Sequence, residues 1–348
     1  MAAEIGILRP PSEARSLLVR LVRNCPWNKC TFCPAYKGQK FSLRKTEEVI
    51  SDLDEFKAMV AQKEANTDFD LGPLHMWWRA KMRTAFLQDA DALIAPVEQV
   101  VAVVAAMKER FPTLERITTY ARANTLCHRS VDDLKKMKAA GLTRIHIGIE
   151  TGADEVLEFV RKGVTHEKQK RACLRVKEAG LELCCYIMPG LGGRKFSRVH
   201  AEESGRLIAE VEPDHTRLRT CYVLEGTELA EIFNAGNYEI QDDEAVVREI
   251  RLFLSQFAHR QTNLLSDHRI NLLLELNGRL PDESERLFSI IDGFLNFSPE
   301  DKELFIAGRR SGRLRFLDDM EKPAMREKLR KIMKEQDFSR QSPGSYLL

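Results

Sequence analysis

Apolar strand-like segments and helix-like segments alternate through residues 16–220, and this alternation restricts the fold more than any other feature of the sequence. The predicted strands are 16–23, 84–88, 116–122, 143–149, 181–188 and 215–220. The predicted helices are 42–63 with Ser42 as N-cap, 96–110, 130–140, 152–161, 166–179 and 197–211. Such alternation predicts an α/β fold with a parallel sheet. Two forms fit it, an open doubly wound sheet and a curved partial barrel.

The C-terminal part of the chain has a different pattern. Residues 240–340 show only helical periodicity, so we expect a mostly helical C-terminal region. We therefore predict an N-terminal extension over residues 1–15, an α/β core over 16–222 and a C-terminal region over 223–348.

Three of the eight cysteines, Cys25, Cys30 and Cys33, fall within nine residues. Thiolates are soft ligands for zinc and for iron–sulfur clusters. A closed zinc site or an electron-transfer cluster needs four ligands, and the next candidates along the chain are His75 and Cys127. Three thiolates alone would leave one iron of a cluster open to a further ligand. The sequence thus allows a catalytic cluster or, as the alternative, an iron–sulfur electron carrier or zinc-binding protein using the same cysteines.

Several predicted strands carry polar residues on one face, because side chains alternate along a strand. These residues are Arg20, Gln88, Tyr120, Arg122, His146, Glu150, Tyr186, Arg217 and Arg219. Buried charges are costly unless they are paired or bind a ligand, so converging polar faces predict an internal site for a charged molecule. The arginines suit carboxylate or phosphate groups, and we expect Arg122, Arg217 and Arg219 to contact an anionic substrate.

The segment Cys25-Pro26-Trp27-Asn28-Lys29-Cys30-Thr31-Phe32-Cys33 follows the first predicted strand, and in this it resembles the radical S-adenosylmethionine (radical SAM) enzymes. Those enzymes have a partial (β/α)6 barrel with a three-cysteine loop after the first strand, usually spaced C-x3-C-x2-C. Here the first gap is four residues. The resemblance implies a [4Fe–4S] cluster on Cys25, Cys30 and Cys33, with S-adenosylmethionine on the fourth iron. Reductive cleavage would then give a 5′-deoxyadenosyl radical that abstracts hydrogen from a substrate.

The resemblance extends to three other places in the chain. Phe32 matches an aromatic residue that precedes the third cysteine, and Asp91 stands where the acid of a Gly-Gly-Glu motif is expected, although Asp89-Ala90 replace both glycines. The segment around Glu150 is similar to the coproporphyrinogen oxidase and methylthiotransferase type. The end of the fifth strand, with Met188 and Gly190, resembles the strand end that contacts adenine in the family. The resemblance implies that Phe32, Asp91, Glu150, Met188 and Gly190 bind S-adenosylmethionine.

Composition and charge guide the expectations about partners. The net charge of +2 and pI of about 8.1 give no electrostatic argument for nucleic acid, which we regard as an improbable partner. No segment approaches the roughly 20 apolar residues of a membrane span, and the first residues do not resemble a signal peptide. We expect a cytoplasmic protein with a small-molecule substrate. The resemblance further implies an external electron donor of the flavodoxin or ferredoxin type.

Overall fold

The computed structural model describes residues 4–335, which divide into two compact units. Unit 1 contains the residues up to 29, 35–148 and 167–184, and unit 2 contains 30–34, 149–166 and 185 onward. The strand order of the main sheet is β1-β4-β5-β6-β7-β8-β9-β10. Its strands are β1 (Leu17–Val19), β4 (Thr84–Leu87), β5 (Arg116–Ala121), β6 (Arg144–Glu150), β7 (Glu182–Ile187), β8 (His215–Leu218), β9 (Thr262–Leu265) and β10 (Gly278–Leu280). The predicted α/β class is confirmed, and this open, mostly parallel sheet is consistent with a partial barrel.

In unit 1 the strands pair in parallel, with Leu17 opposite Ala85, Phe86 opposite Thr118 and Thr119 opposite Ile145. These residues are completely or almost completely buried. In the sequence, β1 and β4 are mostly apolar, whereas β5 and β6 alternate apolar residues with polar ones, and both patterns are typical of strands.

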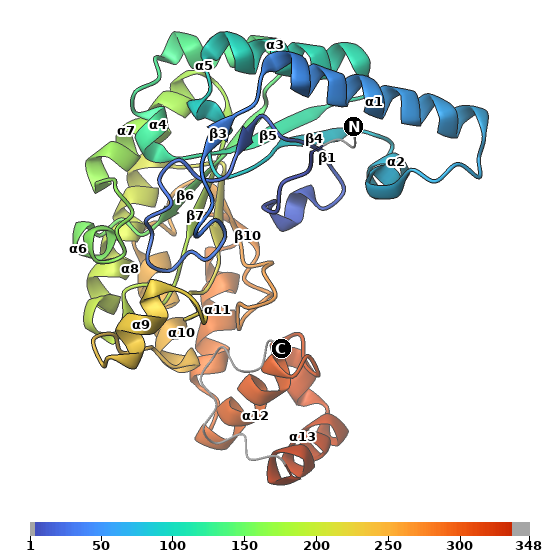
Figure 1. Cartoon of the computed structure of the whole chain (residues 1–348). Coiled ribbons are helices and arrows are strands. Elements are labelled where there is room, and N and C mark those ends of the chain that lie inside the picture. The colour runs from blue at the N-terminus through green and yellow to red at the C-terminus, as the bar shows by residue number, and fades with distance from the viewer. Residues whose placement is uncertain (1–3, 336–348) are drawn as a thin grey trace. The chain divides into compact units, whose positions relative to one another are not determined.

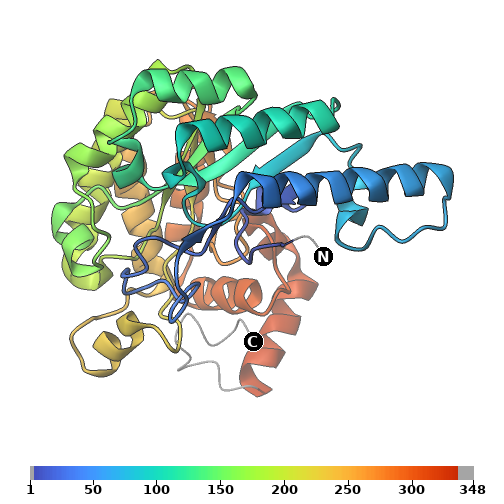
Figure 2. The ribbon, with the colours of Figure 1, turned by 45° about the horizontal axis from the view of Figure 1, so that its top comes forward.

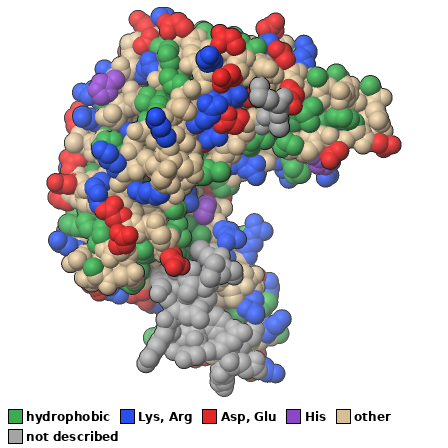
Figure 3. Space-filling model, viewed as in Figure 1, with side chains coloured by type: hydrophobic (Ala, Val, Ile, Leu, Met, Phe, Trp, Pro, Cys, Tyr) green, Lys and Arg blue, Asp and Glu red, His purple; other side chains and the backbone are tan. Residues whose placement is uncertain are grey.

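The helices of unit 1 pack along these strands. They are α1 (Thr46–Ala65), α2 (His75–Arg79), α3 (Val97–Arg110), α4 (Ala123–Leu126), α5 (Val131–Ala140) and most of α7 (His166–Glu178), with the 3-10 turns η1 (Pro11–Glu13), η2 (Gly72–Leu74) and η3 (Ala92–Ile94). Figures 1 and 2 show α1, α3 and α5 side by side. Buried Val100, Val103, Val104 and Met107 form one stripe on α3, at the spacing of an amphipathic helix. Figure 3 shows acidic and basic side chains interspersed on the outer surface of these helices.

Two predictions near the cysteines were wrong in detail. The strand predicted over 16–23 ends as β1 at Val19, and Val22–Arg23 form a separate strand, β2, which pairs antiparallel with β3 (Ser42–Leu43). Ser42 therefore does not cap a helix, and α1 begins at Thr46 with Lys45 as its N-cap. The pairing of Val22 with Leu43 holds residues 42–43 extended and delays the helix.

Unit 2 contains α6 (Asp154–Phe159), α8 (Gly193–Val211), α9 (Glu228–Asn234), α10 (Asp243–Ser255), α11 (Ser284–Leu295), α12 (Pro299–Arg310), α13 (Pro323–Glu335) and the 3-10 turn η4 (Leu317–Glu321). Here β9 pairs in parallel with β8 and antiparallel with β10. The expectation that residues 240–340 hold only helices was thus wrong at these two short strands, although the region is mostly helical. No helix within residues 4–335 has the length and hydropathy needed to cross a membrane.

Candidate functional site

Asp89 anchors the start of the cysteine segment, residues 25–33, in unit 1. Its fully buried carboxylate accepts hydrogen bonds from Arg20 Nε at 2.7 Å, from the Asn24 backbone N–H at 3.0 Å and from the Tyr36 hydroxyl at 2.7 Å. Burial, reinforced by Asp89, raises the pKa of Tyr36 far above its usual range, so the phenol remains a donor. Since Asn24 directly precedes Cys25, this carboxylate fixes the backbone from which the first thiol projects.

Further contacts hold residues 25–29, the part of the cysteine segment that belongs to unit 1. The Asn28 backbone N–H lies 3.4 Å from Cys25 Sγ, and the Asn28 side chain donates to the Tyr36 carbonyl at 2.5 Å. The Trp27 ring faces two cations, with Lys29 Nζ at 5.0 Å and the Arg122 guanidinium at 5.1 Å from its centroid. The structure thus places Arg122, a predicted substrate contact, against the cysteine segment.

In unit 2, Thr31 holds the part of the segment that carries the other two thiols. The buried Thr31 donates its backbone N–H to the Val160 carbonyl at 3.0 Å and accepts the Leu229 N–H at 3.0 Å. Phe32 packs against a cluster that includes Met188, Val160 and Leu191. The segment therefore has one anchor on each side of Cys30.

The donor chemistry of the three thiols fits a cluster. Cys25, Cys30 and Cys33 are partly exposed and form no disulfide. Of the five scattered cysteines, Cys127, Cys173, Cys184 and Cys185 are buried as expected, whereas Cys221 is partly exposed. Cys127 Sγ lies 3.1 Å from the Asn124 carbonyl, so its thiol already has a partner in unit 1. Within residues 4–335, no three His, Cys, Asp or Glu side chains already converge on a metal-binding geometry.

Asp91 has a structural environment unlike that of Asp89. Its fully buried carboxylate accepts hydrogen bonds from the Thr125 hydroxyl at 2.5 Å and the Arg122 backbone N–H at 3.3 Å. Both donors lie at the start of α4, so the carboxylate satisfies backbone and side-chain donors there. Burial raises the pKa of Asp91 from 3.8 to about 6.

Three residues predicted to bind the cofactor, Phe32, Glu150 and Met188, come together in unit 2. Glu150 ends β6 in a left-handed conformation with φ of 65°, and its carbonyl accepts the Met188 N–H at 2.8 Å. Its carboxylate pairs with Lys162 Nζ at 2.9 Å, and the same ammonium group lies 5.8 Å from the centroid of Phe32. Left-handed residues other than glycine are uncommon and often occur at functional sites.

Gly190, which follows Met188 by two residues, has φ of 85° and donates its N–H to Glu249 Oε1 at 2.6 Å. Its carbonyl accepts the Tyr238 hydroxyl at 2.8 Å. Both groups of this glycine are therefore used in fixing the turn after β7.

Of the two remaining arginines, Arg217 lies within β8 and Arg219 directly follows it, and they differ in exposure. Arg217 is buried and its Nη1 lies 3.0 Å from Asp267 Oδ2, whereas Arg219 is exposed. Burial, together with Arg219 and Arg269, lowers the pKa of the nearby His268 to about 4. His268 is therefore neutral near pH 7. The guanidinium of the exposed Arg219 is accessible to an anion.

Sequence reasoning did not single out four residues that the structure places at these points: Tyr36, Asp89, Lys162 and Glu249. Asp89 was visible as part of Asp89-Ala90-Asp91, but its role depends on a partner 53 residues away. Lys162 lies in the segment after β6 that supports the family resemblance, but it was given no role there, and Glu249 lies on a helical segment that carries no local motif.

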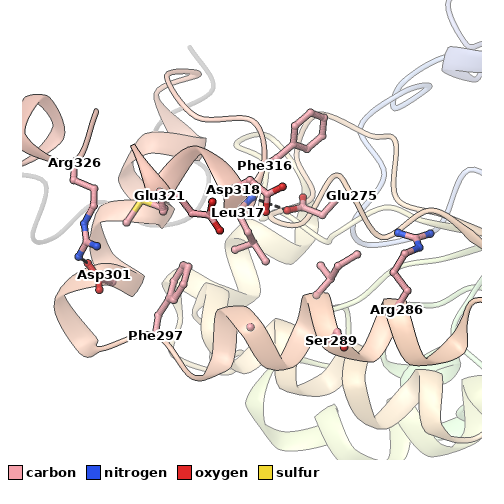
Figure 4. A pocket seen from close by; sticks show the side chains of 13 residues that line it. Glu275, Arg286, Ser289, Phe297, Asp301, Phe316, Leu317, Asp318, Glu321 and Arg326 are labelled. Carbon is pink, nitrogen blue, oxygen red and sulfur yellow. Dashed lines mark hydrogen bonds and ion pairs between the residues drawn. The ribbon is translucent and has the colours of Figure 1, made fainter. Parts of the chain in front are cut away.

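A pocket of about 690 Å³ lies among the C-terminal elements of unit 2 (Figure 4). Glu275, Arg286, Phe297 and Phe316 are among the residues that line it. Glu275 accepts the Leu317 N–H at 2.7 Å, and Arg326 pairs with Asp301. No residue predicted to belong to the site lines this pocket.

Comparison with known families decides the class of the protein. The sequence profile of the radical SAM superfamily matches residues 19–201, more than half of the chain. The chain belongs to the radical SAM superfamily. It is therefore a radical SAM enzyme, and the enzymes of this superfamily use a [4Fe–4S] cluster and S-adenosylmethionine. The class and cofactors expected from the sequence are confirmed.

Individual relatives cover limited parts of this radical SAM enzyme. A tRNA uridine(34) acetyltransferase of Methanocaldococcus jannaschii is 31% identical over 121 residues, which are 33% of this chain and 21% of that protein. The chain thus spans about a fifth of that relative's length. The uncharacterized protein YtqA of Bacillus subtilis is 19% identical over 222 residues, 62% of each protein. The solved structure of OxsB, a cobalamin-dependent S-adenosylmethionine radical enzyme, aligns with a TM-score of 0.51 and 13% identity over 92% of this chain and 50% of that chain, which supports the fold.

Proposed function

We propose that Cys25, Cys30 and Cys33 ligate three irons of the [4Fe–4S] cluster and leave the fourth iron to S-adenosylmethionine. The observation that carries this proposal is that these three thiols are partly exposed and form no disulfide, on a segment anchored by Asp89 on one side and Thr31 on the other. When bound, the cluster supplies the electron that cleaves S-adenosylmethionine to a 5′-deoxyadenosyl radical able to abstract hydrogen from a substrate.

The chain's own residues position the cofactor. Phe32, Met188 and Gly190 offer apolar surface and a fixed turn, which suit an adenine ring. Glu150 offers a carboxylate already oriented by Lys162, which suits a ribose hydroxyl or the methionine amine. Asp91 is included from its place in the sequence, and its present hydrogen bonds to Thr125 and Arg122 would have to be shared with the cofactor.

The proposed substrate is a small molecule with an anionic group. Arg219 is the most exposed of the three arginines expected to contact it, Arg122 lies over Trp27, and Asp267 orients Arg217. Asp267 also neutralises part of the charge of Arg217, so Arg219 is the stronger candidate for the direct contact. The acetyltransferase relatives are named for a tRNA nucleoside, but the near-neutral net charge of +2 still favours a small molecule over nucleic acid. An external flavodoxin or ferredoxin would supply the electron.

The decisive experiment is anaerobic reconstitution with iron and sulfide, followed by reduction and assay of S-adenosylmethionine for 5′-deoxyadenosine. We expect the wild-type chain to form it and Cys30→Ala to lose it. The matched control is Cys173→Ala, which removes a buried thiol on α7 and should retain formation.

The alternative uses of the cysteines give different results in the same preparation. A cluster that forms but never cleaves the cofactor would favour an electron carrier. Zinc bound in place of iron would overturn the proposal.

A further inference from the structure

A buried carboxylate in unit 2 connects to the turn that follows β7. Glu249, on α10, is 4% exposed, and its Oε1 accepts the Gly190 N–H at 2.6 Å. Its Oε2 lies 2.6 Å from Ser197 Oγ and 2.6 Å from Gln241 Nε2. A buried charge is tolerated only when donors surround it, and three donors meet this one.

His200, on α8, continues the connection to the end of β6. Its ring is almost fully buried, with Nε2 3.5 Å from Glu249 Oε1 and Nδ1 2.8 Å from Thr151 Oγ1. It also hydrogen-bonds the backbone of Met188, and burial lowers its pKa. A neutral imidazole has one donor and one acceptor nitrogen, so it can bridge different kinds of partner.

Thr151 completes the connection because it directly follows Glu150. Its hydroxyl oxygen accepts the Ala153 N–H at 3.1 Å, and the Gly152 N–H donates to Ser204 Oγ at 2.8 Å. The buried network therefore reaches all three proposed cofactor residues. It bonds Gly190 and the backbone of Met188 directly, and its Thr151 is the next residue after Glu150.

We propose that Glu249 is a positioning residue for S-adenosylmethionine, acting through Gly190 directly and through His200 on Met188 and Thr151. This inference rests on the proposed function, which assigns Glu150, Met188 and Gly190 to the cofactor. Glu249 itself would contact the turn and the imidazole, and not the reacting atoms. Its role is to hold the ends of β6 and β7 in a fixed position relative to each other.

The carboxylate is suited to this task because it presents only acceptors. A glutamine of the same shape keeps one acceptor, so its amide N–H₂ must face either Gly190 N–H or the Ser197 and Gln241 donors. Gly190 cannot adapt through its side chain, and a Cβ there would lie 3.4 Å from Val246 while φ is 85°. If the amide N–H₂ faces Gly190, the turn must move; if the amide oxygen faces it, the Gly190 N–H still loses its charge-assisted acceptor.

The test uses the reconstituted full chain and measures S-adenosylmethionine binding by equilibrium dialysis, without turnover. We expect Glu249→Gln to raise Kd about tenfold, as expected for one charge-assisted hydrogen bond lost from the bound geometry. Iron content should remain that of the wild type. The electron paramagnetic resonance change that S-adenosylmethionine causes in the reduced cluster should weaken in parallel.

The matched control is Asp243→Asn on the same helix. Asp243 is also a buried carboxylate, but its partner is Arg310 of α12. It should lower the unfolding midpoint while leaving Kd unchanged, which separates positioning from general destabilisation. An unchanged Kd in Glu249→Gln, with tight wild-type binding, would overturn this inference alone. No binding by the wild type would overturn the proposed function and this inference with it.

Discussion

At the residue scale, Asp89 is the side chain on which the cysteine segment depends most. Replacing it with asparagine leaves Arg20, Tyr36 and the Asn24 N–H competing for one neutral acceptor. We expect Asp89→Asn to lower the free energy of unfolding by about 3 kcal/mol, the order observed when one member of a buried pair is removed. Urea denaturation measures this. Tyr36→Phe removes one donor only and should cost about 1 kcal/mol. Equal costs for the two variants would contradict the central role of Asp89.

Asp91 gives a pH dependence of known sign. Its pKa is about 6 in the folded chain against 3.8 for the free side chain, so the folded state binds the proton more tightly. The stability that this proton contributes is fully present below about pH 4 and is lost as the pH rises through about 6. The free energy of unfolding of the wild type, minus that of Asp91→Asn, should therefore fall by roughly 3 kcal/mol as the pH rises over that interval. Above the interval this difference should stay level. Denaturation of both proteins at a series of pH values checks this, and a difference that rises with pH would contradict it.

The two aspartates also show how far sequence reasoning reaches at this scale. The position of both acids after the second predicted strand was readable, and so was the cysteine spacing. The different roles of the two acids could not be read from the sequence. Asp89 accepts from Tyr36 and Asp91 accepts from Thr125, and both contacts form only on folding. Chemistry-bearing residue types can be recognised locally, whereas their hydrogen-bond partners come from distant parts of the chain.

At the element scale, Gly152 determines how closely the end of β6 approaches α8. A Cβ at this position would collide with the carbonyl group of Glu203, which is backbone and cannot rotate away. We expect Gly152→Ala to destabilise the chain by about 2 kcal/mol. Gly293→Ala is the matched control, because a Cβ there meets only Leu317 at 3.9 Å and alanine favours a helix such as α11. That variant should gain about 0.5 kcal/mol in urea denaturation. A destabilisation by both substitutions would show that the approach of α8 is not the cause.

Elements with a clear period were predicted, and those set by pairing were not. The apolar run of β4, the alternating pattern of β6 and the apolar stripe of α3 carry their own signal. By contrast, β3 and β10 have two and three residues, too few to show alternation, and β9 lies in a region where the helical pattern dominates. Ser42 looked like a helix cap because its side chain suits one, but pairing of Leu43 with Val22 prevails. Tertiary context decides such short segments.

At the scale of the whole molecule, the two units share strands β6 and β7, each of which has residues in both. All three tryptophans, at positions 27, 77 and 78, belong to unit 1, so their fluorescence reports on that unit while far-ultraviolet circular dichroism reports on both. We expect the two signals to change at the same urea concentration, because neither unit can lose its strands alone. Separate midpoints would show that the units unfold independently.

The distribution of thiol accessibility has a practical consequence for chemical footprinting. Among the eight cysteines, four are buried, and the fourth partly exposed one, Cys221, has its pKa raised to about 12 by burial. Alkylating reagents attack thiolates, so near pH 8 Cys221 should react far more slowly than an ordinary thiol. Brief alkylation of the native metal-free chain, read by mass spectrometry, should therefore mark Cys25, Cys30 and Cys33 first. The loss of those three labels on reconstitution would count the occupied ligands directly, one sulfur atom at a time.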